Sequence, residues 1–311
     1  MQAAAMALSC TVCVSAAEDE TIKLTVWGAE EDQDLLKELT DKFQEKYADQ
    51  KFDIQIGVES ESTAKDTILT DVEAGADVYA FADDQLTDLV KAGALLKLDD
   101  YAEALQLADT TLDDVKAANV EGAIDAASWD SLLEAADKAG KKVGMTLASG
   151  NLVACVSGTW GAITAQDVFG DGYAATKLPT FTVGDKQVQQ GSVAGYKYVG
   201  VNGYSENSGW AVLLAEYLTN EESQQMFFDQ RESGPSNKNV AASDSVQENV
   251  ALAALAAQSE YAQAQKVGGK YWDPAQTFGE LVAQGTLSVD DDNAIQEALD
   301  NLVDGVTAPV E

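Results

Sequence analysis

The sequence contains no histidine, and this absence removes the commonest catalytic sites. Neither a Ser-His-Asp triad nor a Cys-His pair can form without histidine, and a histidine-built zinc site is excluded as well. Hydrolysis by two carboxylates needs no histidine, so this enzyme class stays open. The acidic run at residues 290–293 lacks the spacing of an EF-hand calcium loop, and we interpret it as the cap of a helix from Ala294. We expect neither a metal nor a cofactor.

Basic residues are scarce as well. The chain of 311 residues has 19 lysines and arginines against 53 acids, and its net charge of -34 makes nucleic acids and anionic membrane surfaces poor partners. Apolar residues make up 46% of the sequence, which is enough to build folded cores, and the length allows one large domain or two ordinary ones. The excess acid is therefore expected mostly on a solvated surface.

Cysteines and long apolar runs are few. Cys10 and Cys13 lie in the leading segment and leave Cys155 alone, so no disulfide framework is predicted. Residues 1–17 are small, apolar and uncharged, and they resemble the apolar region and cleavage end of a signal peptide, although the usual basic start is missing. The alternative is a weak buried helix, but the abrupt change at Glu18 favours a processed leader. Cys10 is an imperfect lipoprotein attachment site, and no later run is long enough to cross a membrane.

Two strand ends combine an aromatic residue with acids. Residues 21–28, 52–58 and 77–81 alternate as strands do, and the first and third are followed by acidic clusters. Ligands of open α/β sheets bind outside the carboxyl ends of the strands. Aromatic rings pack on the C–H faces of sugars and carboxylates accept their hydroxyls, so this mixture predicts a carbohydrate ligand. The candidate ligand-binding residues here are Trp27, Glu30, Glu31, Phe81, Asp83, Asp84 and Gln85.

The order of elements predicts an α/β fold with mostly parallel sheets flanked by helices. Residues 33–47 have the apolar spacing of an amphipathic helix, and strands and helices alternate around it. Trp160 ends a later strand and is a further ligand-binding candidate, whereas Trp210 lies among apolar residues at helical spacing and is expected in the core. Further strands are expected at 141–147, 152–160, 173–178, 179–182 and 191–201, and further helices at 62–74, 84–91, 208–218, 221–228 and 247–265.

Six segments in succession resemble the maltose- and maltodextrin-binding proteins of bacterial ABC importers. They are TVWGAEED, ADVYAFADDQ, VSGTW, ATKLPTF, GSVAGY and LTNEESQ, at residues 25–32, 76–85, 156–160, 175–181, 191–196 and 218–224. The resemblance implies a monomeric, hinge-linked binding protein of two lobes that close around a sugar and hand it to a membrane permease. It implies binding without catalysis, and a location outside the cytoplasm, periplasmic or attached to the cell surface.

The same resemblance divides the chain and adds site residues. After the leader, residues 18–105 would form the first lobe and residues 106–311 a shortened second lobe, with helices that can return to the first. Trp160 matches a stacking tryptophan, and the ring that forms a further platform would be Trp272 or one of its neighbours, Tyr271 and Phe278. In each case the alternative is that the ring only caps a core.

Relative to these proteins, the sequence lacks two stretches. After Ala127 the chain passes directly into a helical pattern at 128–139, where relatives have a strand that crosses back to the first lobe, and a second stretch is missing near Gly150. A sheet that lacks an internal strand exposes an unpaired edge, which predicts lower stability or self-association. Two alternative functions stay open: a glycoside hydrolase that uses two of the predicted carboxylates as acid and base, and, because of the missing stretches, a degenerate relative that no longer binds.

Overall fold

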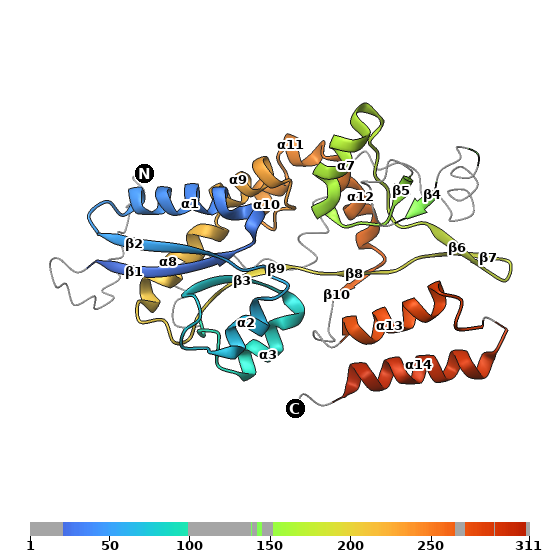
Figure 1. The fold of residues 1–311 in the computed structure, drawn as a ribbon. Coiled ribbons are helices and arrows are strands. Elements are labelled where there is room, and N and C mark those ends of the chain that lie inside the picture. Colours follow the sequence, from blue (N-terminus) through green and yellow to red (C-terminus); the bar gives the residue numbers. More distant parts are fainter. Residues whose placement is uncertain are drawn as a thin grey trace, which may run out of the picture.

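The computed structural model has two lobes joined by extended segments (Figure 1). It describes residues 21–98, 138, 142–144, 152–264, 271–288 and 290–308. The first lobe contains β1 (Ile22–Gly28), η1 (Glu30–Asp32), α1 (Gln33–Lys46), β2 (Phe52–Val58), α2 (Ala64–Thr70), β3 (Val78–Ala82), η2 (Asp83–Gln85), α3 (Leu86–Lys91), β9 (Lys197–Val201), α8 (Ser208–Thr219), α9 (Glu221–Arg231) and α10 (Lys238–Ala241). The predicted α/β fold with mostly parallel strands is confirmed.

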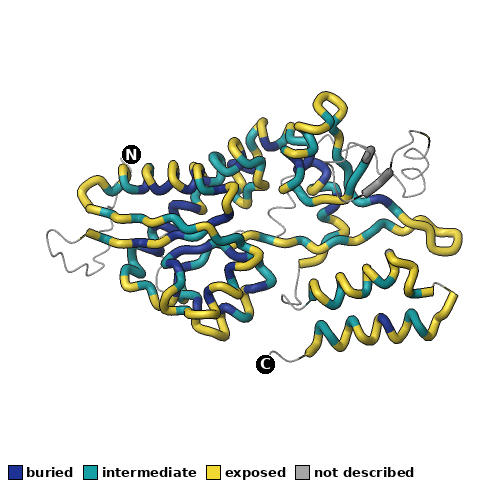
Figure 2. The backbone as a smooth tube through the Cα atoms, in the orientation of Figure 1, coloured by how far each residue is buried: buried dark blue, intermediate teal, exposed yellow. Residues whose placement is uncertain are grey.

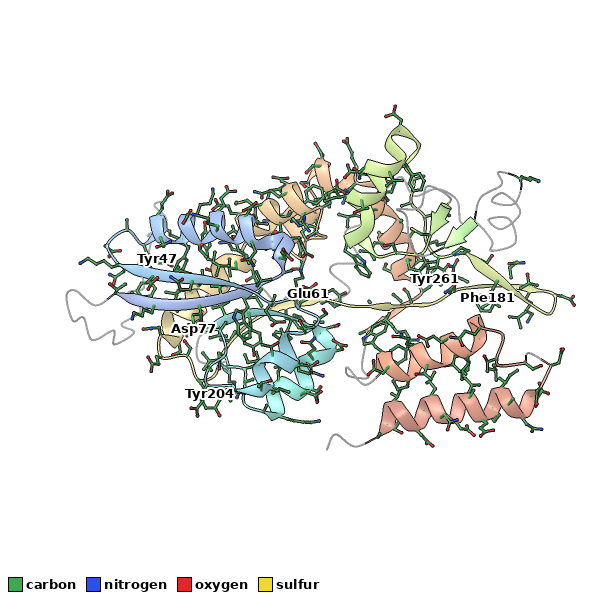
Figure 3. The ribbon with its side chains drawn as sticks, in the orientation of Figure 1. Tyr47, Glu61, Asp77, Phe181, Tyr204 and Tyr261 are labelled. Atoms are coloured by element: carbon green, nitrogen blue, oxygen red, sulfur yellow. The ribbon has the colours of Figure 1, made fainter. Side chains whose placement is uncertain are left out.

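The sheet of the first lobe has the strand order β2-β1-β3-β9. The central strand β1 pairs in parallel with β2 and β3, and β9 pairs antiparallel with β3. Because parallel neighbours end at the same edge, the loops after β1, β2 and β3 gather on one side of the lobe. In Figure 3, Glu61 of the loop after β2 lies on the side that faces the second lobe.

The main core lies between this sheet and helices α1 and α8. Leu24 and Val26 alternate toward it from β1, while the amphipathic helix α1 contributes Phe43, which is completely buried. Trp210 of α8 packs edge-on against Phe52, with ring centroids 5.1 Å apart, so its expected core position is confirmed. Figure 2 shows the buried backbone concentrated here.

Side chains extend the short pairing between β1 and β3. Asp77 accepts hydrogen bonds at Oδ2 from the backbone N–H (2.7 Å) and the hydroxyl (2.9 Å) of Thr25. Its Oδ1 accepts from Ser205 at 2.5 Å, which ties the segment before α8 to the same place. A segment far along the chain thereby completes the first lobe.

The second lobe consists of small sheets and helices. Its described elements are β4 (Lys142–Gly144), β5 (Leu152–Cys155), η4 (Thr159–Gly161), α7 (Ala162–Phe169), η5 (Gly170–Gly172), β6 (Thr180–Val183), β7 (Lys186–Gln189), β8 (Ser192–Ala194), α12 (Val250–Ser259) and β10 (Ala262–Ala264), with α11 (Asp244–Gln247) leading into it. The β6–β7 hairpin turns at Gly184, whose positive φ of 60° suits glycine. β8 pairs in parallel with β10 and continues toward β9 after only Gly195 and Tyr196. One extended segment thus serves both lobes.

The last two described helices are α13 (Trp272–Ala283) and α14 (Asp292–Thr307). They run side by side next to the second lobe in Figure 1. The predicted cap of α14 is confirmed, because the side chain of Asp291 accepts hydrogen bonds from the N–H groups of Asn293 and Ala294, both at 3.1 Å. None of the described helices is both long and apolar enough to span a bilayer.

Several sequence-based predictions of secondary structure were wrong in part. Residues 173–178 form no strand, and the expected strand 191–201 is broken at Gly195 and Tyr196. The expected strand 152–160 ends at Cys155, and the helices expected at 62–74 and 247–265 cover only Ala64–Thr70 and Val250–Ser259. The break separates pairing with β10 from pairing with β3, so tertiary contacts decide it. The residues on which both missing stretches were inferred, 127–139 and 150–151, lie largely or wholly outside the described chain, and so do the leader and Cys10.

Candidate ligand-binding site

The loops after β2 and β3 are joined by the side chain of Gln85. Its amide Nε2 donates to the carbonyl oxygens of Glu61 (2.9 Å) and Ser62 (2.8 Å), and its Oε1 accepts from the N–H of Lys65 (3.2 Å). Gln85 is 4% exposed, so all of its capacity is directed into the protein. The structure therefore gives this predicted ligand-binding residue a positioning role, in which it fixes the loop that carries Glu61.

Phe81, another predicted stacking residue, lies inside the first lobe. It is 3% exposed and packs between Tyr79 and Tyr198, with centroid distances of 5.9 and 5.7 Å. A ring covered in this way offers no free face to a sugar in this conformation. Tyr198 of β9 is 41% exposed and stands at the surface over Phe81. The strand that covers Phe81 is distant in the sequence, which is why the motif after β3 does not reveal its burial.

Asp83 and Asp84 lie where the first lobe meets the hinge segment and the C-terminal helix pair. The N–H of Asp83 donates to the carbonyl of Tyr196 at 2.9 Å, directly at the break between β8 and β9. Partial burial raises the pKa of Asp83 above its usual range, and the neighbouring charge of Asp84 raises it further, against the lowering effect of backbone N–H groups. The indole Nε1 of Trp272 donates to Oδ2 of Asp84 at 3.3 Å. Asp84 and Trp272, two predicted site residues that are far apart in the sequence, are thus in contact.

A network of ion pairs supports the loops after β1 and β2. Asp32, which follows Glu30 and Glu31, has a buried carboxylate that accepts from Nε of Arg231 at 3.1 Å and pairs with Nζ of Lys197 at 3.5 Å. Lys197 also pairs with Glu61 at 3.4 Å. These residues join the loops after β1 and β2 to β9 and α9. The acidic cluster was visible in the sequence, but the helical phase that turns Asp32 inward, and its distant cationic partners, were not.

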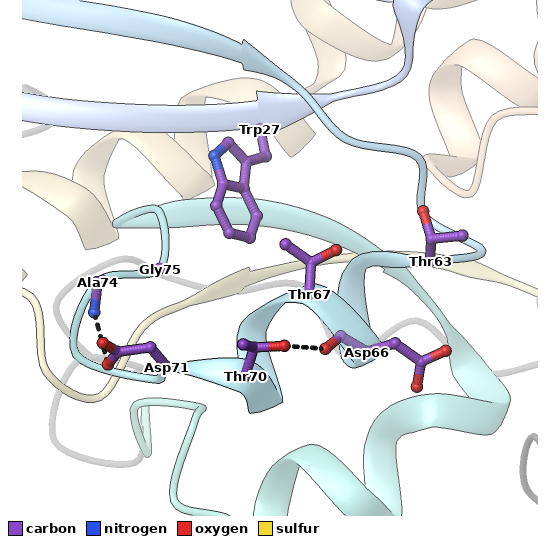
Figure 4. Close-up of a pocket in the computed structure, with 8 residues that line it drawn as sticks. All are labelled: Trp27, Thr63, Asp66, Thr67, Thr70, Asp71, Ala74 and Gly75. Carbon is purple, nitrogen blue, oxygen red and sulfur yellow. Dashed lines mark hydrogen bonds between the residues drawn. The ribbon is translucent and has the colours of Figure 1, made fainter.

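The other predicted residues of the first lobe face solvent or a separate hollow. Glu30 and Glu31 are exposed on η1, with no covering element among the described residues. Trp27 is partly buried and lines a hollow beside α2 rather than the surface around Asp83 and Asp84 (Figure 4). The structure therefore separates Trp27 from the acids that follow it in the sequence.

Trp160 is the most exposed of the predicted aromatic residues. Its side chain follows β5 on η4 and is 87% exposed. A Cβ atom at Gly158 would collide with the six-membered edge of the indole, so glycine at that position leaves room for the ring. The ring is open to solvent, as a stacking platform requires.

Two consecutive residues connect α9 to different parts of the molecule. Arg231 binds Asp32 of the first lobe, whereas the carboxylate of Glu232 accepts from Gln166 of α7 at 3.2 Å and from Asn249, before α12, at 3.1 Å. Glu232 has a left-handed backbone with φ of 50°, the one positive φ of a described residue other than glycine. The side chains of this turn link the two lobes.

Within the described ranges, no three or more acidic or cysteine side chains are grouped so as to hold a metal ion.

Comparison with known proteins finds one matching family and several solved structures of similar fold. Residues 138–254 match the family described as bacterial extracellular solute-binding protein. A maltodextrin-binding protein from L. casei without ligand superposes with a TM-score of 0.73 at 18% identity, over 94% of this chain and 100% of that one. The Thermus thermophilus maltotriose-binding protein, bound with maltotriose, gives 0.66 at 16% identity over 92% and 99%. A structure with acarbose gives 0.72 at 25% identity over 92% and 98%. No curated protein matches.

Proposed function

Because the chain resembles bacterial extracellular solute-binding proteins, and many structural neighbours are maltose- or maltodextrin-binding proteins, we propose that it binds maltose-type oligosaccharides outside the cytoplasm. In this proposal it delivers them to the permease of an ABC importer and catalyses no reaction. A leader of residues 1–17 that directs export and is removed belongs to the same proposal, and so does its alternative, a lipid anchor at Cys10 that would keep the protein on the outer side of the membrane.

The observation that carries the proposal is the contact between Trp272 and Asp84. It places a half-exposed indole, 55% accessible, beside the carboxylates of Asp84 and Asp83 at the hinge. A sugar ring can pack on the indole while its hydroxyls donate to these carboxylates. Trp160 supplies a second exposed platform in the other lobe, so that a sugar held between the lobes could contact both rings.

The charges of this region favour a neutral ligand. Lys197 and Arg231 are already paired with Asp32, and Lys197 also with Glu61, while Asp83 and Asp84 present negative charge. An anionic ligand would meet these acids within a chain of net charge -34. Neutral oligosaccharides incur no such repulsion, and their hydroxyls suit carboxylate acceptors.

A thermal melt of the full chain tests the proposal. Maltose, maltotriose and longer maltodextrins should raise the midpoint, because a ligand that binds only the native state at 100 times its Kd adds about 2.7 kcal/mol to its stability. Sugars of other classes and amino acids should not. A cooperative melt whose midpoint no maltooligosaccharide changes would contradict the proposal, and would favour the degenerate relative.

Three further measurements test binding against the alternatives. Trp160→Ala should weaken maltotriose binding in calorimetry by about tenfold or more, whereas the matched control Tyr204→Ala, at an exposed ring remote from the second lobe in Figure 3, should not. Reducing-sugar release on prolonged incubation would indicate the glycoside hydrolase instead. Small-angle scattering should show compaction on saturation if the lobes close.

A further inference from the structure

A hollow of about 480 Å³ lies on the first lobe, between the sheet and α2 (Figure 4). Its volume is within the range of small-molecule pockets and is sufficient for a mono- or disaccharide. It shares no lining residue with the surface around Asp83, Asp84 and Trp272. The lining residues are Trp27, Thr63, Asp66, Thr67, Thr70, Asp71, Ala74 and Gly75.

Trp27 forms one wall of the hollow, and its ring is held in a fixed position. A Cβ atom at Gly57, its partner on β2, would collide with the ring, so the indole lies directly against the strand. Tyr79 packs beside it at a centroid distance of 6.4 Å and an interplanar angle of 57°. In the part of the chain that the structure describes, no acceptor is bonded to the indole N–H of Trp27. The wall is therefore an aromatic surface held against the sheet.

The opposite wall, formed by α2 and the turn at residues 71–75, is also held in place. Asn202, which is 1% exposed, donates from Nδ2 to the carbonyls of Val72 (2.9 Å) and Gly75 (3.4 Å). Asp71 closes the turn by accepting at Oδ1 from the N–H of Ala74 at 3.3 Å, a bond drawn in Figure 4. A site with both walls preformed loses little conformational entropy when a ligand binds.

The hollow carries net negative charge. Asp66 pairs with Lys65 at 3.4 Å on the exposed surface, whereas Asp71 is bonded, among the described residues, only by backbone N–H groups of its own turn and keeps its charge. An anion would therefore be repelled. The remaining groups are the second oxygen of Asp71, the hydroxyl of Thr67 and the indole of Trp27, a set that matches the hydroxyls and C–H face of a sugar.

We propose that this hollow is a second carbohydrate site, which binds a neutral mono- or disaccharide with Trp27 as its stacking surface. A ring lying on the indole would accept a hydrogen bond from Thr67 and donate to Asp71. The site is independent of the inter-lobe surface and does not rest on the proposed function. It remains available whether the lobes are open or closed, because all its lining residues belong to the first lobe.

Fluorine NMR of the full chain labelled with 5-fluorotryptophan tests this proposal. Trp27→Phe assigns the Trp27 resonance, and the resonance of Trp210, which is partly buried against the core of the first lobe, serves as the internal reference. Methyl α-glucoside and maltose should each shift the Trp27 resonance saturably, with Kd in the millimolar range. Thr67→Val should raise that Kd about fivefold by removing one hydrogen bond. The matched control Thr87→Val, on the exposed surface of α3 outside the hollow, should leave it unchanged.

Three outcomes would overturn the proposal. The first is a Trp27 resonance that stays fixed up to about 200 mM sugar, a concentration at which even a very weak site would be occupied. The second is a shift that saturates together with that of Trp272 and disappears in Trp160→Ala, since Trp27 would then only report events between the lobes. The third is a shift produced by choline and not by sugars, which would make the site one for organic cations.

Discussion

Replacing Asn202 by alanine should lower the free energy of unfolding by about 3–5 kcal/mol. The side chain is almost completely buried and makes contacts in two directions: it donates to the carbonyls of Val72 and Gly75, and it accepts from the N–H of Tyr204 at 3.0 Å. The two short bonds are each worth about 1 kcal/mol net, and a buried polar group left without a partner costs about 1–3 kcal/mol. The sum is a large share of the roughly 5–15 kcal/mol that stabilises a typical domain.

Urea unfolding followed by far-UV circular dichroism and by tryptophan fluorescence measures this loss. Asn202→Asp should destabilise at least as much, because the carboxylate can still accept from Tyr204 but would face the carbonyls of Val72 and Gly75 as a buried charge at neutral pH. Hydrogen exchange should accelerate in the turn at residues 71–75. Asn301→Ala, at an exposed position of α14, is the matched control and should change stability by less than about 0.5 kcal/mol. A loss below about 1 kcal/mol in Asn202→Ala would refute the reasoning that this side chain anchors the turn.

Three more predictions follow from the core and from the hinge. Phe43→Ala should destabilise the first lobe by about 3–5 kcal/mol in urea unfolding, because the ring is completely buried among other aromatic rings, whereas Phe181→Ala, at a 41% exposed ring, should have little effect; equal losses would contradict this. Asp83→Asn should raise the melting midpoint at pH 7, because the fold raises the pKa of this carboxyl. Its stabilising protonated form is present below the unfolded pKa and is lost as pH rises through the folded pKa, so the gain should vanish near pH 3; a gain independent of pH would argue against burial as the cause. Trp160→Ala should leave the midpoint without sugar nearly unchanged, because its ring is 87% exposed, and a large drop would show that the ring supports the fold instead.

The sequence predicted the first lobe well where its patterns are local. The helix expected at 33–47 matches Gln33–Lys46 because its apolar residues repeat at helical spacing over several turns. The strand at 191–201 was predicted without its break, since alternation continues across Gly195 and Tyr196 while the pairing partner changes. Local periodicity identifies an element but does not identify its neighbours.

The sequence allowed the loops of the candidate site to be predicted, but not which of their side chains are exposed. Strand ends followed by acids placed the candidate residues at one edge of the sheet, and Asp84 does lie beside Trp272. Phe81 and Gln85 turn inward because β9 and the loop after β2 cover them, and both contacts depend on residues far away in the sequence. Asp32 was missed for the same reason: its cationic partners lie on β9 and α9. Burial and pairing over long sequence distances depend on tertiary structure.

The ties between the lobes have a consequence for how easily the molecule opens. Gln166 meets Glu232 through a hydrogen bond at 3.2 Å, and Trp272 meets Asp84 through another at 3.3 Å. When such polar groups separate, water takes the place of each lost partner, so the net cost is only about 1 kcal/mol per bond. Separating the lobes at these contacts would therefore cost little free energy, and a ligand with even a modest preference for one arrangement would be enough to favour it.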